Sequence, residues 1–138
     1  MAAPRRMVTF FMTTGSLGHG LPVGFGMALA GRGDRKGYRV YVILGDGECD
    51  EGSIWETAMA ASHHRLENLT VIVDRNKLSL DGPTEEILTL EPLAEKWRSF
   101  GWHAIELDGH DVRQLYDGLR EAQETRGRPT AIVARTIK

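Results

Sequence analysis

Short apolar runs alternate along the chain with stretches in which apolar residues recur every three or four positions. Four of these runs predict buried strands: 38–44, 69–73, 102–107 and 130–136. Four other stretches predict helices: 18–30, 50–65, one opened by Pro92 and one capped by Asp111. Strands that alternate with helices indicate an α/β fold, a doubly wound, mostly parallel sheet with helices on both faces.

Each predicted helix has an expected buried face. In helix 50–65, Asp50 is the expected N-cap, and the apolar stripe consists of Ile54, Trp55, Ala58, Met59 and Ser62. The helix after Asp111 is expected to point four residues inward: Val112, Leu115, Leu119 and Ala122. Helix 18–30 is rich in Gly and Ala, which permits either tight packing on the sheet or a contact between subunits. The irregular stretch 74–91 is long enough to be functional.

Composition narrows the class of protein. The chain has 138 residues, 41% hydrophobic residues and a net charge of −2, which suits one globular domain and provides no basic surface for nucleic acid. No apolar run is long enough to span a membrane. The single cysteine, Cys49, cannot form an internal disulfide, which suits a reducing compartment.

The N-terminal sequence permits one alternative to a cytoplasmic protein, namely an exported one. Arg5 and Arg6 precede an apolar run, 7–12, as they would in an export signal. However, six glycines between residues 15 and 31 interrupt the apolar core that such a signal needs. We therefore expect a cytoplasmic protein.

Two polar residues follow neighbouring strands at the point where each strand ends. Gly45-Asp46-Gly47 follows the first strand, and Asn76 follows the second. Ligands of open α/β sheets bind beyond the carboxyl ends of strands, and carboxylate and amide oxygens suit Mg²⁺. The Gly47 N–H is placed to donate to a phosphate. Asp46 is expected at a strand end rather than in the core. The alternative is that Gly45-Asp46-Gly47 is only a strand-to-helix turn.

The other polar residues nearby are expected to be less important. Glu48 and Asp50 are interpreted as a solvated helix start that the helix dipole favours. His19 adjoins the first glycine-rich segment and either contacts a ligand there or lies on the surface. His110 is expected to be structural.

Three segments together resemble transketolase in the part of its N-terminal domain that binds thiamine diphosphate. They are Thr13-Thr14-Gly15-Ser16-Leu17-Gly18, Gly45-Asp46-Gly47-Glu48-Cys49-Asp50-Glu51-Gly52 and the segment from Asp74-Arg75-Asn76 to Thr84. The resemblance covers 13–138 and leaves 1–12 as a tail. The short Gly-Leu-Pro start of the first helix resembles bacterial transketolases that are split into two chains.

The resemblance implies a role for each matching residue. It makes Asp46, Asn76 and the Leu78 carbonyl ligands of Mg²⁺, with Gly47 and Asn76 also contacting the cofactor. Three further positions complete the set: Gly15 and Leu17 at the aminopyrimidine and thiazolium region, and Glu51 at a cofactor-proximal subunit interface. Glu56 matches a second glutamate of a carboxylate network, or is simply an exposed helix residue. Glu51 and Glu56 are the catalytic candidates.

The resemblance also implies a partner. Two-carbon ketol transfer between sugar phosphates would need a subunit with the pyrimidine domain, whose glutamate activates the cofactor. We therefore expect a homo- or hetero-oligomer that is inactive without this partner, and no nucleic acid or membrane partner. Two alternatives stay open. One is a catalytically silent interaction module, and the other is a subunit of a different thiamine diphosphate enzyme, such as a 2-oxoacid dehydrogenase or deoxyxylulose phosphate synthase.

Overall fold

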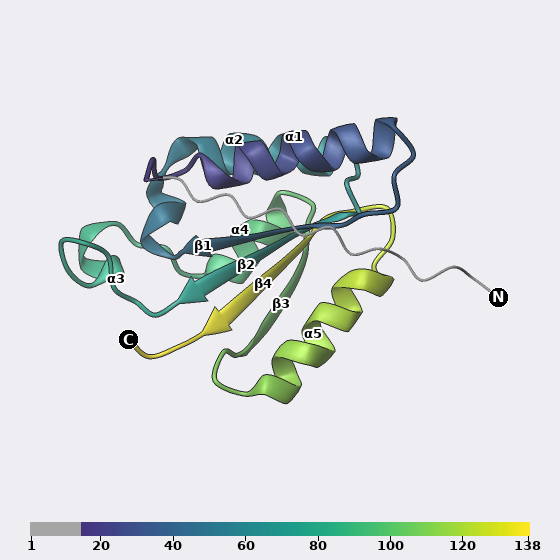
Figure 1. The fold of residues 1–138 in the computed structure, drawn as a ribbon. Coiled ribbons are helices and arrows are strands. Elements are labelled where there is room, and N and C mark those ends of the chain that lie inside the picture. The colour runs from purple at the N-terminus through teal and green to yellow at the C-terminus, as the bar shows by residue number, and fades with distance from the viewer. Residues whose placement is uncertain (1–14) are drawn as a thin grey trace.

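The computed structural model describes residues 15–138, so Thr13, Thr14 and the 1–12 tail lie outside the described residues. The fold is built on one parallel sheet (Figure 1). In spatial order its strands are β1 (Val40–Gly45), β2 (Leu69–Arg75), β4 (Thr130–Arg135) and β3 (His103–Asp108). All four strands therefore end at the same edge of the sheet, as the sequence predicted.

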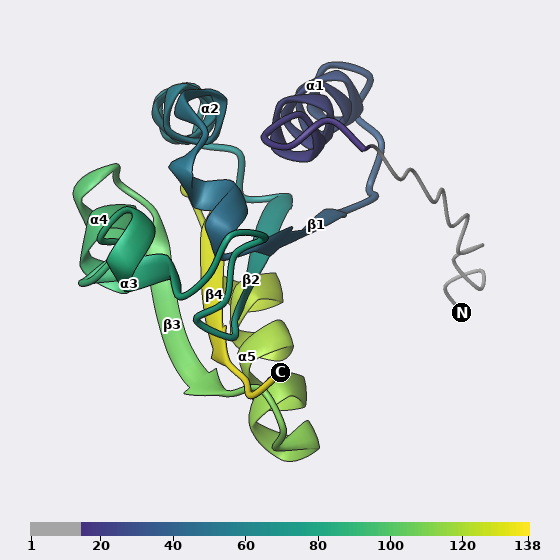
Figure 2. The ribbon, with the colours of Figure 1, turned by 90° about the vertical axis from the view of Figure 1, so that its left-hand side faces the viewer.

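Helices cover both faces of this sheet, which confirms the predicted fold class (Figure 2). One face is covered by α1 (Gly20–Gly33), α2 (Gly52–His63) and α4 (Leu93–Ser99), and the other by α5 (Val112–Glu124). Two short elements lie in the loops: the 3₁₀ turn η1 (Gly47–Asp50) and α3 (Thr84–Ile87). Within residues 15–138, no helix is both long and apolar enough to cross a bilayer.

The central and edge strands differ in how they are buried. On β2, Val71 and Val73 enter the core beneath α1, α2 and α4, while Ile72 packs on the α5 side. Burial on both faces explains the continuous apolar run of this strand. On the edge strand β1, Tyr41 and Ile43 face the α5 side and are exposed, Ile43 at 74%. Gln123 of α5 donates to the Tyr41 hydroxyl at 3.2 Å, but Tyr41 remains 41% exposed.

The small residues of α1 pack inside the domain. A Cβ at Gly24 would collide with Val42, and one at Gly31 would collide with Tyr38. Ala28 is fully buried in the same core. The structure thus supports the first of the two explanations for the Gly-rich helix, because these positions allow α1 to approach β1 closely.

Three predicted details of the helices are wrong. The N-cap of α2 is Glu51 rather than Asp50, because residues 47–50 form the separate turn η1. Met59 is exposed, because the buried stripe of α2 runs through Ile54, Ala58 and Ala61 and leaves Met59 on the opposite side. Val112 is exposed as well, because the buried stripe of α5 begins a turn later. The cap at Asp111 is confirmed, since its carboxylate accepts the Arg113 and Gln114 N–H groups.

Candidate cofactor and metal site

Three segments far apart in sequence meet at the carboxyl ends of β1 and β2. The loop 15–18 joins the turn after β1, because the Gly18 N–H donates to Glu48 Oε1 at 3.0 Å. Ser53 Oγ donates to the Gly18 carbonyl at 2.8 Å and holds the loop from the other side. The loop after β2 joins the same turn, because the Lys77 N–H donates to Asp46 Oδ2 at 2.6 Å. The three sequence motifs thus form one surface.

Asp46 is the centre of this arrangement, and it is buried. Its side chain is only 1% exposed, so the expectation that it lies outside the core is wrong. Oδ2 accepts hydrogen bonds from Arg75 Nη1 at 2.8 Å and from the Lys77 N–H. Among the described residues, Oδ1 accepts only the Gly47 N–H, at 2.9 Å. Because a carboxylate oxygen has two lone pairs, Oδ1 retains the capacity to bind a cation.

Arg75 is the main residue that the sequence interpretation missed. Its side chain is fully buried and forms ion pairs with three carboxylates: Asp46 at 2.8 Å, Glu85 at 2.6 Å and Glu91 at 3.2 Å. Thr84 Oγ1 also accepts a hydrogen bond from Nη1. Burial opposes the charge, but the hydrogen bonds to Asp46 and Glu91 raise the pKa of Arg75. Glu91 also pairs with Arg135 at 3.8 Å, and Arg135 pairs with Glu106 at 2.5 Å. The two guanidiniums and four carboxylates of this network sum to −2, which favours a nearby divalent cation.

A signal for Arg75 was present in the strand pattern. Side chains alternate between the two faces of a strand, so residues 71, 73 and 75 share one face. Val71 and Val73 are core residues, and Arg75 follows them onto that same buried face. A buried arginine needs anionic partners, which α3 and the residues after it provide.

Asn76 and Leu78 present further oxygen atoms beside Asp46. The Asn76 amide is oriented on both sides, since its Nδ2 donates to Asp74 Oδ2 at 2.8 Å and its Oδ1 accepts the Leu78 N–H at 2.9 Å. Among the described residues, no donor hydrogen-bonds to the Leu78 carbonyl. Mg²⁺ binds a few protein oxygens together with phosphate and water oxygens. The donor set Asp46 Oδ1, Asn76 Oδ1 and Leu78 carbonyl fits that chemistry. The described chain has no cluster of three His, Cys, Asp or Glu residues that would suit another metal.

Gly47 allows the turn after β1 to touch the loop after β2. A Cβ at Gly47 would lie 3.0 Å from Ser79 Cβ and 3.3 Å from Ser79 Cα, closer than real side chains normally approach. The Gly47 N–H donates to Asp46 Oδ1. A diphosphate oxygen would therefore have to share or replace this interaction in order to use the Gly47 N–H.

The acidic turn η1 is more buried than a solvated helix start, so that interpretation of Glu48 and Asp50 is wrong. The Glu48 carboxylate connects two segments by accepting N–H groups from Gly18 and, at 3.4 Å, from Gly45. Asp50 is half-buried, one of its oxygen atoms has no partner within residues 15–138, and burial raises its pKa. Burial, with the neighbouring carboxylates, raises the pKa of Cys49 to about 12. The 3₁₀ turn η1 causes the burial of Glu48, Cys49 and Asp50, because it folds their side chains back towards the carboxyl end of β1.

Comparison with known proteins decides the family. The sequence profile of the family described as transketolase, thiamine diphosphate binding domain, matches residues 5–138, almost the whole chain. The chain belongs to this family.

Relatives named as transketolase subunits match the chain over most of its length. The 6-deoxy-6-sulfo-D-fructose transketolase subunit SqwG of Clostridium sp. (strain MSTE9) is 48% identical over 134 residues, 97% of this chain and 49% of the relative. An apulose-4-phosphate transketolase subunit of Phocaeicola vulgatus is 42% identical over 92% of this chain and 45% of the relative. The chain thus spans about half the length of these curated relatives.

Solved transketolases share the fold. The enzyme of Campylobacter jejuni superposes with a TM-score of 0.84 at 27% identity, over 89% of this chain and 20% of that chain. A Pichia stipitis transketolase superposes with a TM-score of 0.83 at 34% identity, again over 89% and 20%. The chain therefore has the transketolase fold over a part of its cofactor-binding domain.

The remaining residues that match the transketolase motifs lie around the rim of the site. Gly15 and Leu17 are exposed on the loop that Glu48 holds. Glu51 lies beside this loop. Gly18 has a φ of +76°, and a Cβ added to it would lie 2.7 Å from Glu51 Cβ. Glu56 is exposed on α2. The structure thus brings Glu51 to the loop and leaves both carboxylates accessible to solvent.

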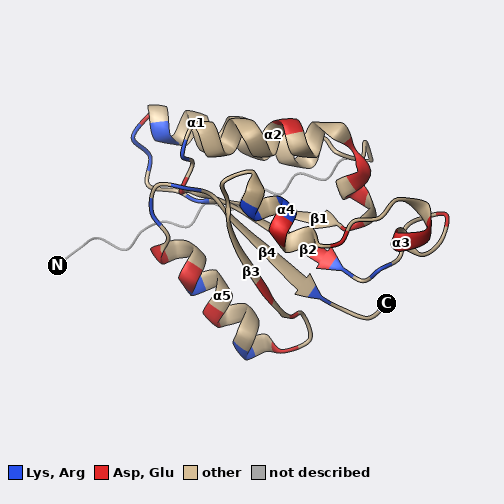
Figure 3. Cartoon of the chain, turned by 180° about the vertical axis from the view of Figure 1, so that it is seen from behind, with Lys and Arg blue, Asp and Glu red and all other residues tan. Residues whose placement is uncertain are grey.

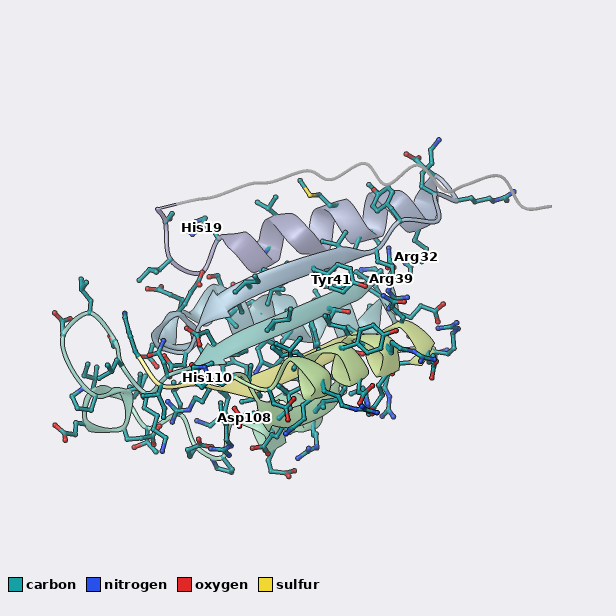
Figure 4. The ribbon with its side chains drawn as sticks, turned by 60° about the horizontal axis from the view of Figure 1, so that its bottom comes forward. His19, Arg32, Arg39, Tyr41, Asp108 and His110 are labelled. Carbon is teal, nitrogen blue, oxygen red and sulfur yellow. The ribbon has the colours of Figure 1, made fainter. Side chains whose placement is uncertain are left out.

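The two histidines considered from the sequence differ in role. His19 is exposed at the start of α1, with Nδ1 3.0 Å from both Ser16 Oγ and the Leu17 carbonyl (Figure 4). It therefore helps to shape the loop 15–18. His110 Nε2 accepts the Ile137 N–H at 2.9 Å and connects the β3–α5 loop to the chain after β4. The structural role predicted for His110 is confirmed.

Proposed function

We propose that this chain supplies the magnesium and diphosphate half of a transketolase-type active site. Asp46 Oδ1, Asn76 Oδ1 and the Leu78 carbonyl bind Mg²⁺ at the carboxyl ends of β1 and β2. The observation that supports this most directly is the set of three hard oxygen donors on segments that Lys77 and Gly47 hold together. The net charge of −2 in the network of Arg75 and Arg135 attracts the cation.

The cofactor is thiamine diphosphate, which when bound supplies the carbanion chemistry for two-carbon transfer. Gly15 and Leu17 contact its ring region, and Gly47 and Asn76 face its diphosphate. The protein's contribution is orientation. Glu48 anchors the ring-contacting loop to the turn after β1, so the two ends of the cofactor are held at a set spacing.

A partner subunit with a pyrimidine domain completes the site. Leu17 is exposed, and Leu80 is 98% exposed on the loop after β2, so two of the loops at the proposed cofactor position carry exposed apolar side chains. Relatives named as subunits support this assembly. Glu51 and Glu56 are the proposed catalytic carboxylates at that interface, and the substrates are sugar phosphates. The cytoplasm is the proposed compartment.

A calorimetric titration of the chain with thiamine diphosphate, with and without Mg²⁺, tests the metal site. We expect binding that depends on Mg²⁺, and a loss of at least about tenfold in affinity for Asn76→Ala, which removes one metal ligand. Asn76→Asp keeps an oxygen ligand and should retain more of the affinity. Gln123→Ala removes an exposed carboxamide from α5, away from the proposed metal site, and should bind as the parent does. Equal affinity with and without Mg²⁺ in the parent would overturn the proposal.

A two-carbon transfer assay between a ketose phosphate and an aldose phosphate tests the dependence on a partner. The chain alone, saturated with thiamine diphosphate and Mg²⁺, should show no turnover, because groups that act as a unit lose activity together. Addition of a subunit with the pyrimidine domain should produce turnover. Turnover by the chain alone would contradict this part of the proposal.

A non-catalytic interaction module is the second candidate. It is favoured by the ion pair of Arg75 with Asp46, which places a protein cation beside the proposed metal ligand. Under this alternative, the chain would bind the partner subunit but would show no Mg²⁺-dependent cofactor binding.

A further inference from the structure

A second concave site lies at the opposite edge of the sheet, where the strands begin. It is a pocket of about 440 Å³ between the α1–β1 loop, the α2–β2 loop and Gly127. Strands of six residues at about 3.3 Å each place this pocket some 20 Å from the candidate metal site. Pockets for small molecules measure about 300–1,000 Å³, so its size suits such a ligand.

The pocket is strongly basic. Arg32, Lys36, Arg39 and Arg65 line it, and its only acidic lining residue is Glu67. Four positive charges and one negative charge give a net +3 in a chain whose total is −2. Figure 3 shows the corresponding blue segments in the loops at the amino ends of the strands.

None of these four cations forms an ion pair with a carboxylate in residues 15–138. The Glu67 carboxylate is already engaged, since its Oε2 accepts the Gly127 N–H at 2.7 Å. Lysine and arginine on protein surfaces usually lie among charges of both signs. Four unpaired cations around one cavity therefore create a positive potential that an anionic ligand would neutralise.

Main-chain contacts hold two of the cations in place. Arg39 Nη2 donates to the carbonyls of Glu67 at 2.6 Å and Ala122 at 2.7 Å, and its buried Nε atom has no partner in the described chain. Arg32 donates to the His64 carbonyl. Figure 4 shows Arg32 and Arg39 together at this end, with His19 at the other. These two positive charges are thus oriented before any ligand arrives, which reduces the entropy cost of binding.

We propose that this pocket binds a small phosphorylated metabolite through its phosphate group. Arginine recognises phosphate through paired N–H donors, and the cavity has room for a phosphate together with an attached sugar-sized group. The site is separate from the proposed cofactor site. The proposal does not depend on thiamine diphosphate binding.

The test is an NMR titration of the ¹⁵N-labelled chain without Mg²⁺ and without thiamine diphosphate. The probes are inorganic phosphate, ribose 5-phosphate and, as a neutral control, ribose. We expect ribose 5-phosphate to shift the amide signals of Gly37, Arg65 and Gly127, inorganic phosphate to shift the same signals at higher concentration, and ribose to shift none. Shifts confined to Gly47 and Leu78 would overturn the proposal, because they would place the phosphate at the cofactor site.

A charge-matched pair of double variants provides the second arm. Lys36→Gln/Arg65→Gln removes two charges from exposed side chains of the pocket, and Arg113→Gln/Arg120→Gln removes two from exposed side chains of α5. The first should weaken ribose 5-phosphate binding by about tenfold or more, and the second by less than about twofold. Equal affinities for both variants would overturn the proposal, as would binding of a long polyanion such as heparin with no response to ribose 5-phosphate. Thermal unfolding of both variants checks that each is folded.

Discussion

The two edges of the sheet handle charge in opposite ways. At the carboxyl ends, one buried arginine forms ion pairs with three carboxylates. At the amino ends, four cations surround an open pocket, and none of them pairs with a carboxylate in the described part of the chain. Burial of a charge makes its partners essential to the fold, whereas an exposed charge can be altered at little cost. Substitutions at the first edge should therefore affect stability, and those at the second should affect binding.

The largest expected effect is the loss of Arg75. Arg75→Met leaves Asp46 buried without its cation, so the free energy of unfolding should fall by about 3–5 kcal/mol. Urea denaturation measures it. Lys36→Gln, which removes a cation at the other edge, should change the free energy by no more than about 0.5 kcal/mol. Similar losses for the two variants would show that the edges do not differ in this way.

The next largest effect is the pH dependence that Cys49 contributes to the free energy of unfolding. Burial first, and then the nearby carboxylates, raise the pKa of its thiol from 9.0 to about 12. Between these values, the unfolded chain loses the thiol proton and the folded chain keeps it. This contribution to stability is therefore complete below pH 9 and is lost as the pH rises towards 12, by up to about 4 kcal/mol. Cys49→Ala should flatten the alkaline loss of stability in urea titrations. An unchanged slope would contradict the prediction.

A smaller effect on stability is expected from a substitution at Gly47, with Gly37 as its control. Gly47→Ala forces a methyl group against Ser79, whereas a Cβ at Gly37 meets nothing within 4 Å. The first substitution should cost about 1–3 kcal/mol and weaken Mg²⁺-dependent cofactor binding, since the loop after β2 must shift. Gly37→Ala should be close to neutral, within about 0.5 kcal/mol. Thermal unfolding and calorimetry measure both quantities, and equal behaviour of the two variants would argue against close packing at Gly47.

The smallest effect is expected at the basic edge itself. Lys36→Glu introduces a carboxylate among three arginines, so the free energy of unfolding should rise by a few tenths of a kcal/mol, about 0.5 at most. The gain should disappear in 1 M salt, where charges are screened within about 3 Å. A gain of the same size in high salt would mean that the four cations do not repel one another.

Much of the fold was predictable because it depends on local patterns. The four apolar runs became four strands with ends that moved by one or two residues, and Asp111 caps α5 as predicted. The meeting of Asp46 with the loop that carries Asn76 was also predictable, because parallel strands end at a common edge. These inferences need only the order of the elements along the chain.

The errors lie where contacts between distant segments decide the outcome. Glu48 was interpreted as solvated, but the loop 15–18 covers it and donates an N–H group. Met59 fits an apolar helical stripe, yet α2 turns Ala61 inward instead, beside the correctly predicted Ala58. Arg75 lies within a motif but had no predicted role, because its partners lie on the stretch 84–91 that looked merely irregular.

The sequence alone thus determined the class of fold, the order of its elements and the segments that form the candidate site. Hydrophobic periodicity and the glycine, aspartate and asparagine spacing are local properties, and local properties can be read along the chain. Only the tertiary structure decided that Asp46 is buried against Arg75, and that cations from the end of α1, the α1–β1 loop and the α2–β2 loop share one pocket. Both depend on which side chains meet across the fold, because electrostatic energy is set by distance and burial rather than by sequence separation.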